Sequence, residues 1–206
     1  MEKIYWENYY KKHREPTSES PFAKYISKYL KKDKLLIELG CGNGRDSTYF
    51  SKLGVNTVGV DQCQDEIKHL SKKYSSNNLS FKIHDFTRMS TNKQYNYIYS
   101  RFTLHSVDED AENRVLKWAY NSLHKYGLFF IELRSIDDDM YKKGIKKRDN
   151  VSITDHYRRF AEFDKLKNKL TEEGFDIIES IKSKGIAKHN NEDPVVVRFI
   201  AKKVRE

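Results

Sequence analysis

Three glycines stand close together at Gly40, Gly42 and Gly44, with Glu38 before them and Asp46 after them. A tight turn requires one glycine, whereas further glycines let another group lie against bare backbone. Their spacing is G-x-G-x-G, which differs from the G-x-G-x-x-G spacing that holds a dinucleotide pyrophosphate. A carboxylate at Glu38 would repel a pyrophosphate and could pair with an ammonium group. The pattern favours a ligand with an ammonium group over a tight turn without a ligand.

Two further acidic residues lie at the ends of the next apolar segments. Asp61 lies about 20 residues beyond the glycines, where a carboxylate can accept both hydroxyls of a ribose. Asp85 and Phe86 end a later stretch, and there a carboxylate can accept an adenine amino group while a ring covers the base. Ammonium, ribose and adenine together describe S-adenosylmethionine, which is therefore the predicted cofactor.

A second group of residues could bind and activate a methyl acceptor. His105 follows a predicted strand at 95–102 and is a candidate general base, or alternatively a histidine that braces the next helix. Guanidinium groups bind phosphate or carboxylate in bidentate geometry. The predicted acceptor-binding residues are aromatic or basic: Trp6, Tyr10, Arg14, Arg134, His156, Tyr157, Arg158 and Arg159. The alternative is that the segment around 155–160 is a solvated loop and that an N-terminal helix packs its aromatic face on the core.

Strands alternate with helices in the elements that must position these residues. Strands are predicted at 34–39, 56–61, 79–86, 95–102, 127–135, 175–183 and 195–203. Helices are predicted at 20–30, 45–54, 64–74, 109–127 and 161–174, with a further one inside 5–16. This alternation predicts an α/β fold with a Rossmann-like, doubly wound, mostly parallel sheet of seven strands. The last two strands lack a helix between them, so one edge of the sheet is expected to be antiparallel.

A single domain is expected over 1–206, in three parts. Residues 1–33 would form a helical lid, and residues 34–135 the cofactor-binding core. Residues 136–206 would supply a long charged connection, a helix and the final strand pair. The first part of that connection, 136–149, is expected to act as a mobile flap.

Composition restricts the partners. The chain has 206 residues, and 39 Lys and Arg against 30 Asp and Glu give a net charge of +9. Such a surface attracts nucleic acid, anionic membranes or small anions, although solvated lysines alone would give the same number. The apolar runs are shorter than the ~20 residues of a membrane helix, and no apolar signal core opens the chain. A cytoplasmic protein without membrane insertion is expected. Cys41 and Cys63 lack metal-ligand spacing, so no metal is expected.

The chain resembles the class I S-adenosylmethionine-dependent methyltransferases, most clearly over 34–135. The resemblance lies in IELGCGNGRD (37–46), Asp61 and HDF (84–86). It implies that Glu38 and the glycines hold the methionine part, that Asp61 holds the ribose, and that Asp85 and Phe86 hold the adenine. The predicted cofactor-binding residues are Glu38, Gly40, Gly42, Asn43, Gly44, Arg45, Asp61, Gln62, Asp85, Phe86 and Arg101. Arg101 is also expected among the arginines that surround an anionic acceptor.

Two narrower resemblances concern the acceptor. GNGRDS (42–47) is similar to tellurite-resistance and thiopurine-type small-molecule methyltransferases, in which Arg45 and Asp46 would lie near the methionine carboxylate or the lid. The N-terminal aromatic segment and the HYRRF segment (156–160) resemble methyltransferases of bacterial capsule and surface-polysaccharide gene clusters, including those of O-methyl phosphoramidate decoration. O-methylation of a small anionic precursor is therefore the predicted reaction.

Other functions remain as alternatives. The net charge of +9 is compatible with an RNA or protein methyltransferase. However, no RNA-binding module is evident, so nucleic acid is not an expected partner. The end of the fourth strand lacks both the Asn/Asp-Pro-Pro-aromatic motif of amino-methylating DNA enzymes and the cysteine of cytosine-C5 enzymes. A cofactor-binding protein without methyl transfer would lack part of the site, yet every expected cofactor position is filled.

Overall fold

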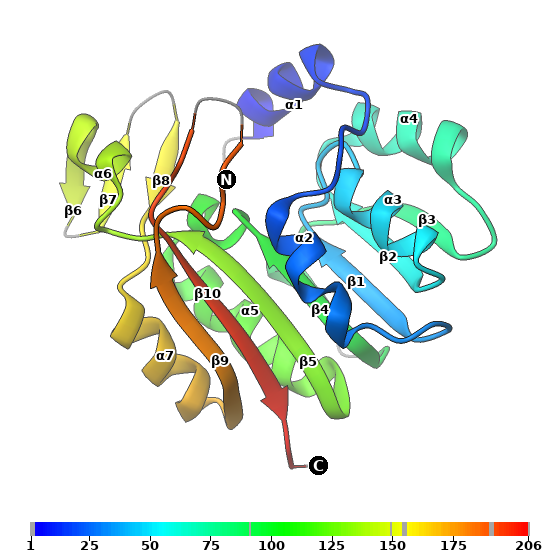
Figure 1. Ribbon diagram of the computed structural model, residues 1–206. Coiled ribbons are helices and arrows are strands. Elements are labelled where there is room, and N and C mark those ends of the chain that lie inside the picture. The colour runs from blue at the N-terminus through cyan, green and yellow to red at the C-terminus, as the bar shows by residue number, and fades with distance from the viewer. Residues whose placement is uncertain (1–2, 91, 149, 154–155, 190–191, 206) are drawn as a thin grey trace.

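Ten strands and seven α-helices are present in the residues that a computed structural model describes, which are 3–90, 92–148, 150–153, 156–189 and 192–205 (Figure 1). The main-sheet strands are β1 (Leu35–Leu39), β2 (Asn56–Asp61), β3 (Leu79–Ile83), β4 (Tyr95–Arg101), β5 (Leu123–Arg134), β9 (Phe175–Ser183) and β10 (Val196–Lys203). The helices are α1 (Lys3–Lys12), α2 (Pro21–Ile26), α3 (Arg45–Lys52), α4 (Gln64–Tyr74), α5 (Glu109–Ser122), α6 (Asp139–Lys143) and α7 (Phe163–Glu172). The 3-10 turns are η1 (Ser27–Tyr29), η2 (Phe86–Arg88) and η3 (Leu104–Ser106).

The main sheet has the strand order β3-β2-β1-β4-β5-β10-β9. The five strands from β3 to β5 pair in parallel. Strand β10 runs antiparallel to both β5 and β9, so the antiparallel pairing lies at the β9 edge. The predicted Rossmann-like, doubly wound sheet of seven strands is thus confirmed.

Helices cover both faces of the sheet. One apolar cluster lies between the sheet and α5 and α7, and it includes Ile98, Leu116 and Phe199. A second cluster lies beneath α2 and α3 and includes Phe22 and Phe50. Because both faces are buried, the central strands consist of nearly continuous apolar residues, as parallel sheets require.

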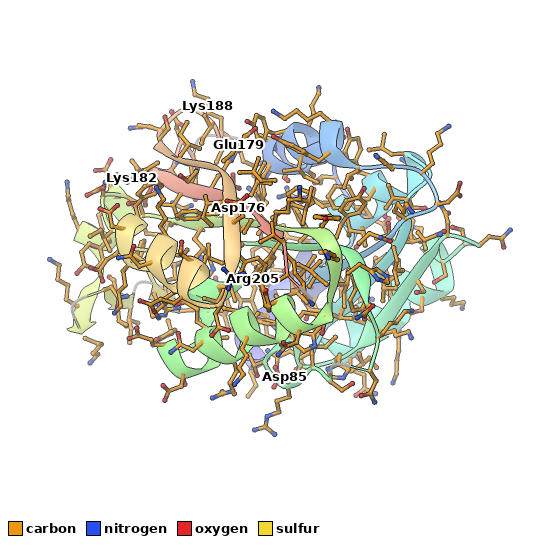
Figure 2. The ribbon with its side chains drawn as sticks, turned by 90° about the horizontal axis from the view of Figure 1, so that it is seen from below. Asp85, Asp176, Glu179, Lys182, Lys188 and Arg205 are labelled. Atoms are coloured by element: carbon orange, nitrogen blue, oxygen red, sulfur yellow. The ribbon has the colours of Figure 1, made fainter. Side chains whose placement is uncertain are left out.

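The N-terminal helix α2 begins at a well-formed cap. Ser20 accepts a hydrogen bond from the backbone N–H of Ala23, and Pro21 occupies the first helical position. At the β9 edge of the sheet, Glu179 accepts hydrogen bonds from Tyr25 of α2 at 2.5 Å and from Tyr29 of η1. Figure 2 labels Glu179 among the charged side chains that cover the outside of the molecule.

Two predictions about element boundaries are wrong. Helix α5 ends at Ser122 rather than at position 127, because Leu123 is buried, pairs with Tyr95 and accepts a hydrogen bond from Lys203 Nζ at 3.0 Å. The strand predicted at 79–86 ends at Ile83, and the 3-10 turn η2 begins at Phe86. The charged connection 136–159 contains α6 and a small antiparallel sheet of β6 (Ile145–Arg148), β7 (Val151–Ile153) and β8 (Tyr157–Arg159).

The carboxyl ends of β1, β2, β4 and β5 meet at one edge of the sheet, since these strands are parallel. Ligands of open α/β sheets bind at this edge. Helix α1 lies across it at the top of the view, between the small sheet and α4 (Figure 1). None of the described helices is both long enough and apolar enough to span a bilayer.

Candidate active site

The glycine loop (40–44) connects β1 to α3 in left-handed backbone geometry. The φ angles of Gly40, Gly42 and Gly44 are 64°, 53° and 72°, which favour glycine. A Cβ atom at Gly40 would lie 2.3 Å from Thr103, and one at Gly42 would lie 2.3 Å from the Tyr10 hydroxyl. A loop with side chains therefore could not keep its contacts with the end of β4 and with α1.

Gly44 is missing from the residues that line the cavity described below, although the sequence suggested that it faces the ligand. A Cβ atom there would lie 2.9 Å from Phe81 and 3.1 Å from Leu70. These two side chains belong to a small buried cluster between α4 and β3. Gly44 thus permits close packing of the loop on this cluster.

Glu38 is a buried carboxylate without an ion-pair partner in the described chain. It is 5% exposed, and the Ser47 hydroxyl donates a hydrogen bond to it at 2.5 Å. Burial, reinforced by the neighbouring Asp46 carboxylate, raises the pKa of Glu38 well above its usual value. A cationic ligand group beside Glu38 would relieve this cost, since an opposite charge favours the ionised form.

Asp61, at the end of β2, is held in place by backbone groups. Its two carboxylate oxygens accept hydrogen bonds from the N–H groups of Gly42 at 3.1 Å and Cys63 at 2.9 Å. Each oxygen keeps a further lone pair for a ligand hydroxyl. Asp61 therefore contacts the glycine loop directly, and Glu38 lies in β1 just before that loop.

Asp85 and Phe86 form the third part of the cofactor side. One Asp85 oxygen caps η2 by accepting from the Thr87 N–H at 2.9 Å and the Thr87 hydroxyl at 2.7 Å. Its other oxygen lies 3.9 Å from the exposed Arg88. Phe86 is 4% exposed and lines the same cavity. The site can therefore offer an adenine ring one carboxylate oxygen, from Asp85, and one aromatic side chain, from Phe86.

One cavity of 1090 Å³ unites these residues with the predicted acceptor side. Single-ligand pockets have volumes of about 300–1,000 Å³, so this cavity is large enough for a cofactor and a small acceptor together. The predicted residues that line it are Trp6, Tyr10, Arg14, Glu38, Gly40, Gly42, Asn43, Arg45, Asp61, Gln62, Asp85, Phe86, Arg101, His105, Arg134, His156 and Arg158. Gly44, Tyr157 and Arg159 are the three predicted residues that do not line it.

Arg159 has a structural partner instead. Its guanidinium pairs with the buried Glu112 of α5, and its Nε donates to the Val107 carbonyl at 3.2 Å. Asp46, expected near the methionine carboxylate or the lid, accepts from the Ser20 N–H and hydroxyl, both at 2.7 Å, and from the Tyr99 hydroxyl at 2.8 Å. These two charged groups therefore hold elements of the fold together, and Asp46 also lines the cavity.

His105 lies in η3, directly after β4, and is 5% exposed. Neither of its ring nitrogens has a hydrogen-bond partner among the residues that the structure describes. Burial lowers the pKa of His105 well below its usual value of 6.5. Nearby positive charge lowers it further, from Arg158, His156, Arg134 and Arg101. The imidazole is therefore neutral near pH 7 and able to accept a proton.

Carboxylates position two of the cavity arginines. Glu132 is fully buried and pairs with Arg101 Nε at 2.8 Å and with Arg198 Nε at 2.6 Å. These three residues face one another across β4, β5 and β10. Arg134, at the end of β5, pairs with Asp138 at 3.1 Å and with Glu192 of the β9–β10 connection.

Helix α1 covers both halves of the cavity. The Tyr5 and Trp6 rings lie 4.2 Å and 4.9 Å from the ring of His156, measured between centroids. Tyr10 is half-buried on the cofactor side, where burial and the charge of Asp61 raise its pKa well above the usual value. The sequence assigned Tyr10 to the acceptor, but the structure places it on the glycine loop.

The segment that follows α1 is attached to α4 and to the glycine loop. Lys73 binds both carboxylate oxygens of Glu15 at 2.7 and 2.8 Å, and Tyr74 donates to the same carboxylate. The Asn43 amide donates to the carbonyls of His13 and Glu15, both at 3.1 Å. These contacts anchor the C-terminal end of α1 to α4 and to the glycine loop.

Glu66 of α4 was missed by the sequence analysis, because a glutamate in the first turn of a helix is ordinary. It is 2% exposed and lies 3.9 Å from Arg14. Burial is the main reason that its pKa is raised from 4.5 to about 7. Its proton is therefore bound more tightly in the folded chain than in the unfolded chain.

Glu66→Gln is expected to change the pH dependence of stability. Because the folded-state pKa is the higher one, wild-type stability falls as the pH rises from 4.5 to about 7. The variant lacks this loss, so its free energy of unfolding at pH 8 should exceed that of wild type by up to about 3 kcal/mol. Urea unfolding at pH 5 and pH 8 measures this difference. The exposed Asp65→Asn on the same helix is the control, and equal pH slopes for Glu66→Gln and wild type would contradict the prediction.

The fold and this site define a class I S-adenosylmethionine-dependent methyltransferase domain, and its cofactor is S-adenosylmethionine. A family model described as a methyltransferase domain matches residues 10–180. The chain belongs to that family.

Solved structures with the same fold include an S-adenosylmethionine-dependent methyltransferase from Methanosarcina mazei. Its TM-score is 0.77 at 18% identity, over 88% of this chain and 98% of that one. The 1,6-didemethyltoxoflavin-N1-methyltransferase of Burkholderia thailandensis, with bound S-adenosylhomocysteine, has a TM-score of 0.69 at 18% identity, over 90% and 77% of the two chains.

Among curated sequences, the phosphoethanolamine N-methyltransferase of Plasmodium falciparum is 25% identical over 134 residues, which are 61% of this chain and 50% of that protein. The chain spans half or less of the length of the curated relatives that it matches.

Proposed function

We propose that this protein transfers the methyl group of S-adenosylmethionine to an oxygen of a small anionic acceptor. The observation that carries the proposal is the single cavity that joins the Glu38–Asp61–Asp85 side to His105 and the arginines. The bound sulfonium supplies an activated methyl group. The protein then has to hold the acceptor in line with it, and such positioning is worth about 7–11 kcal/mol.

Each cofactor-side residue has one task in this proposal. Glu38 pairs with the ammonium of the methionine part, which would offset the cost of its own burial. Asp61 accepts the ribose hydroxyls with the lone pairs that its backbone contacts leave. Helix α1 acts as a lid that excludes water, because its aromatic residues line the cavity from the glycine loop to His156.

Charge supports an anionic acceptor. Arg101, Arg134 and Arg158 line the acceptor side, and arginine binds phosphate and carboxylate in bidentate geometry. A neutral imidazole at His105, beside these arginines, supports a hydroxyl as the nucleophile, because a hydroxyl loses its proton to a base during transfer. The cationic groups lie inside a cavity rather than along an open surface, and this favours a small molecule over RNA or a protein.

His105 is the proposed general base. It is buried, neutral near pH 7 and without a hydrogen-bond partner in the described residues, so its free ring nitrogen can receive the hydroxyl proton. Methyl transfer to a neutral hydroxyl leaves a protonated oxygen, and removal of that proton by a base contributes about 10²–10⁴-fold.

The relatives support the acceptor class. The Plasmodium falciparum relative is named for a small phosphorylated acceptor, although for transfer to nitrogen. The resemblance of the N-terminal and HYRRF segments to capsule-cluster methyltransferases extends our proposal to phosphorylated or nucleotide-linked precursors of a surface polysaccharide, including O-methyl phosphoramidate precursors.

A screen of small molecules tests the proposal. Phosphomonoesters, carboxylates and neutral sugars are incubated with the protein and S-adenosylmethionine, and S-adenosylhomocysteine formation is measured. We expect turnover with an anionic hydroxyl compound and competitive inhibition by inorganic phosphate. Arg134→Met and Arg158→Met should raise KM for that compound about tenfold or more, because each loses a charge-assisted contact, and should leave S-adenosylhomocysteine affinity intact. Turnover only with RNA or protein substrates would contradict the proposal.

A further inference from the structure

Phe102 adopts a backbone conformation that a bulky residue rarely adopts. Its φ angle is +52°, directly after the last residue of β4. For a non-glycine residue with a large side chain, this is an unfavourable conformation that surrounding structure has to maintain. The Phe102 N–H donates to the Glu132 carbonyl at 2.9 Å, and the next residue's hydroxyl donates to the Leu39 carbonyl at 2.9 Å. Glycine would fit this turn without strain, so the ring requires a separate reason.

The Phe102 ring is in contact with three polar groups of the acceptor side. The guanidinium carbon of Arg101 lies 4.3 Å from the ring centroid, and that of Arg134 lies 5.6 Å away. The His105 imidazole is stacked on the ring, with centroids 5.8 Å apart and planes inclined by 12°. Phe102 itself lines the cavity.

These groups are otherwise attached to different elements. Arg101 is held by Glu132 of β5, and Arg134 by Asp138 and by Glu192 of the β9–β10 connection. The imidazole of His105 has no hydrogen bond within the described residues to fix its orientation. The flat apolar ring is therefore the packing surface that the two cations and the imidazole share, and cation–π attraction favours this arrangement.

We propose that Phe102 is a positioning residue of the acceptor site. Its ring orients the His105 imidazole and keeps it beside the guanidinium groups of Arg101 and Arg134. The distance between the base and the anion-binding groups then sets which acceptors can place a hydroxyl at His105. This proposal deepens the proposed function and depends on it, because it assigns a purpose to the base and to the arginines.

The effect of the Phe102 ring on the environment of His105 can be measured without an acceptor. The groups that face the imidazole are Arg101 from β4, Arg134 from β5, and His156 and Arg158 from the β7–β8 region. The first cause of its lowered pKa is burial, so exposure to water after loss of the ring should raise that pKa toward 6.5. NMR titration of histidine-labelled protein follows this change, and His105→Asn assigns the signal.

Phe102→Gly is the main variant, since glycine accepts the left-handed backbone. We expect a higher pKa for His105, and an affinity for inorganic phosphate in the presence of S-adenosylhomocysteine that is weaker by about fivefold or more. Tyr126→Gly is the matched control. Tyr126 also has a positive φ angle, +66°, but it is 62% exposed and does not line the cavity. Both readouts should stay at wild-type values in this control.

Two outcomes would overturn the proposal. One is a folded Phe102→Gly protein with the wild-type titration of His105. If that variant does not fold, Phe102→Leu keeps apolar volume without a flat ring, and a phosphate affinity at the wild-type value there has the same consequence. A lack of phosphate binding by the wild type would instead count against the anionic acceptor, while the titration would still decide the role of Phe102.

Discussion

Glu38→Gln should weaken the binding of S-adenosylhomocysteine by at least about 100-fold, because a buried ion pair that loses one partner costs several kcal/mol. The folded protein without cofactor should lose no stability, and it should gain stability at pH 8. Glu38 has no ion-pair partner among the described residues, and its burial disfavours the ionised form. The amide oxygen of glutamine can still accept the Ser47 hydroxyl. Calorimetric titration and urea unfolding measure the two effects.

Glu132→Gln is the matched control for this prediction, because both carboxylates are buried on neighbouring parts of the same sheet. Glu132 already pairs with Arg101 and Arg198. Its loss leaves two buried guanidinium groups without their partner, which is expected to reduce stability by about 3–5 kcal/mol. A gain in unfolding free energy for Glu38→Gln and a loss for Glu132→Gln would distinguish a ligand-binding carboxylate from a structural one. A destabilised Glu38→Gln protein that still binds the cofactor product would contradict our assignment.

The cofactor side could be predicted from the sequence because its residues end apolar strands. Parallel strands present their carboxyl ends at one edge, so Glu38, Asp61 and Asp85 had to approach one another once strands 34–39, 56–61 and 79–86 were recognised. The cavity that all three residues line follows from the same topology. The glycines were less informative one by one, since the bare backbone of Gly44 faces Phe81 and Leu70.

The acceptor side was harder to predict because partners of charged residues are not encoded locally. Arg158 and Arg159 are adjacent and chemically identical, yet strand alternation turns one toward the cavity and the other toward Glu112, 47 residues earlier in the chain. Likewise, nothing in the sequence RFTLH indicates that Phe102 has a positive φ angle, because this depends on contacts with β1 and β5. Sequence patterns predict which element carries a residue, whereas the partner depends on tertiary packing.

His105→Asn should reduce kcat for the acceptor found by screening by about 10²–10⁴-fold, the usual contribution of a general base. The affinity for S-adenosylhomocysteine should stay close to that of wild type, since the expected contact of His105 is with the acceptor. Because the pKa of His105 is well below 6.5, the wild-type rate should be constant near neutral pH and fall only in acid as the imidazole gains a proton.

The pH profile distinguishes a base from a residue that only shapes the cavity. Asparagine does not titrate, so the variant should lack the acid limb that the wild-type kcat/KM profile shows. His124→Asn, at an exposed position outside the cavity, removes another histidine and should preserve both rate and profile. If His105→Asn retained the wild-type rate and the acid limb, deprotonation would not limit the reaction. The arginines and the lid would then act by placing the hydroxyl in line with the methyl group, which alone is worth about 7–11 kcal/mol.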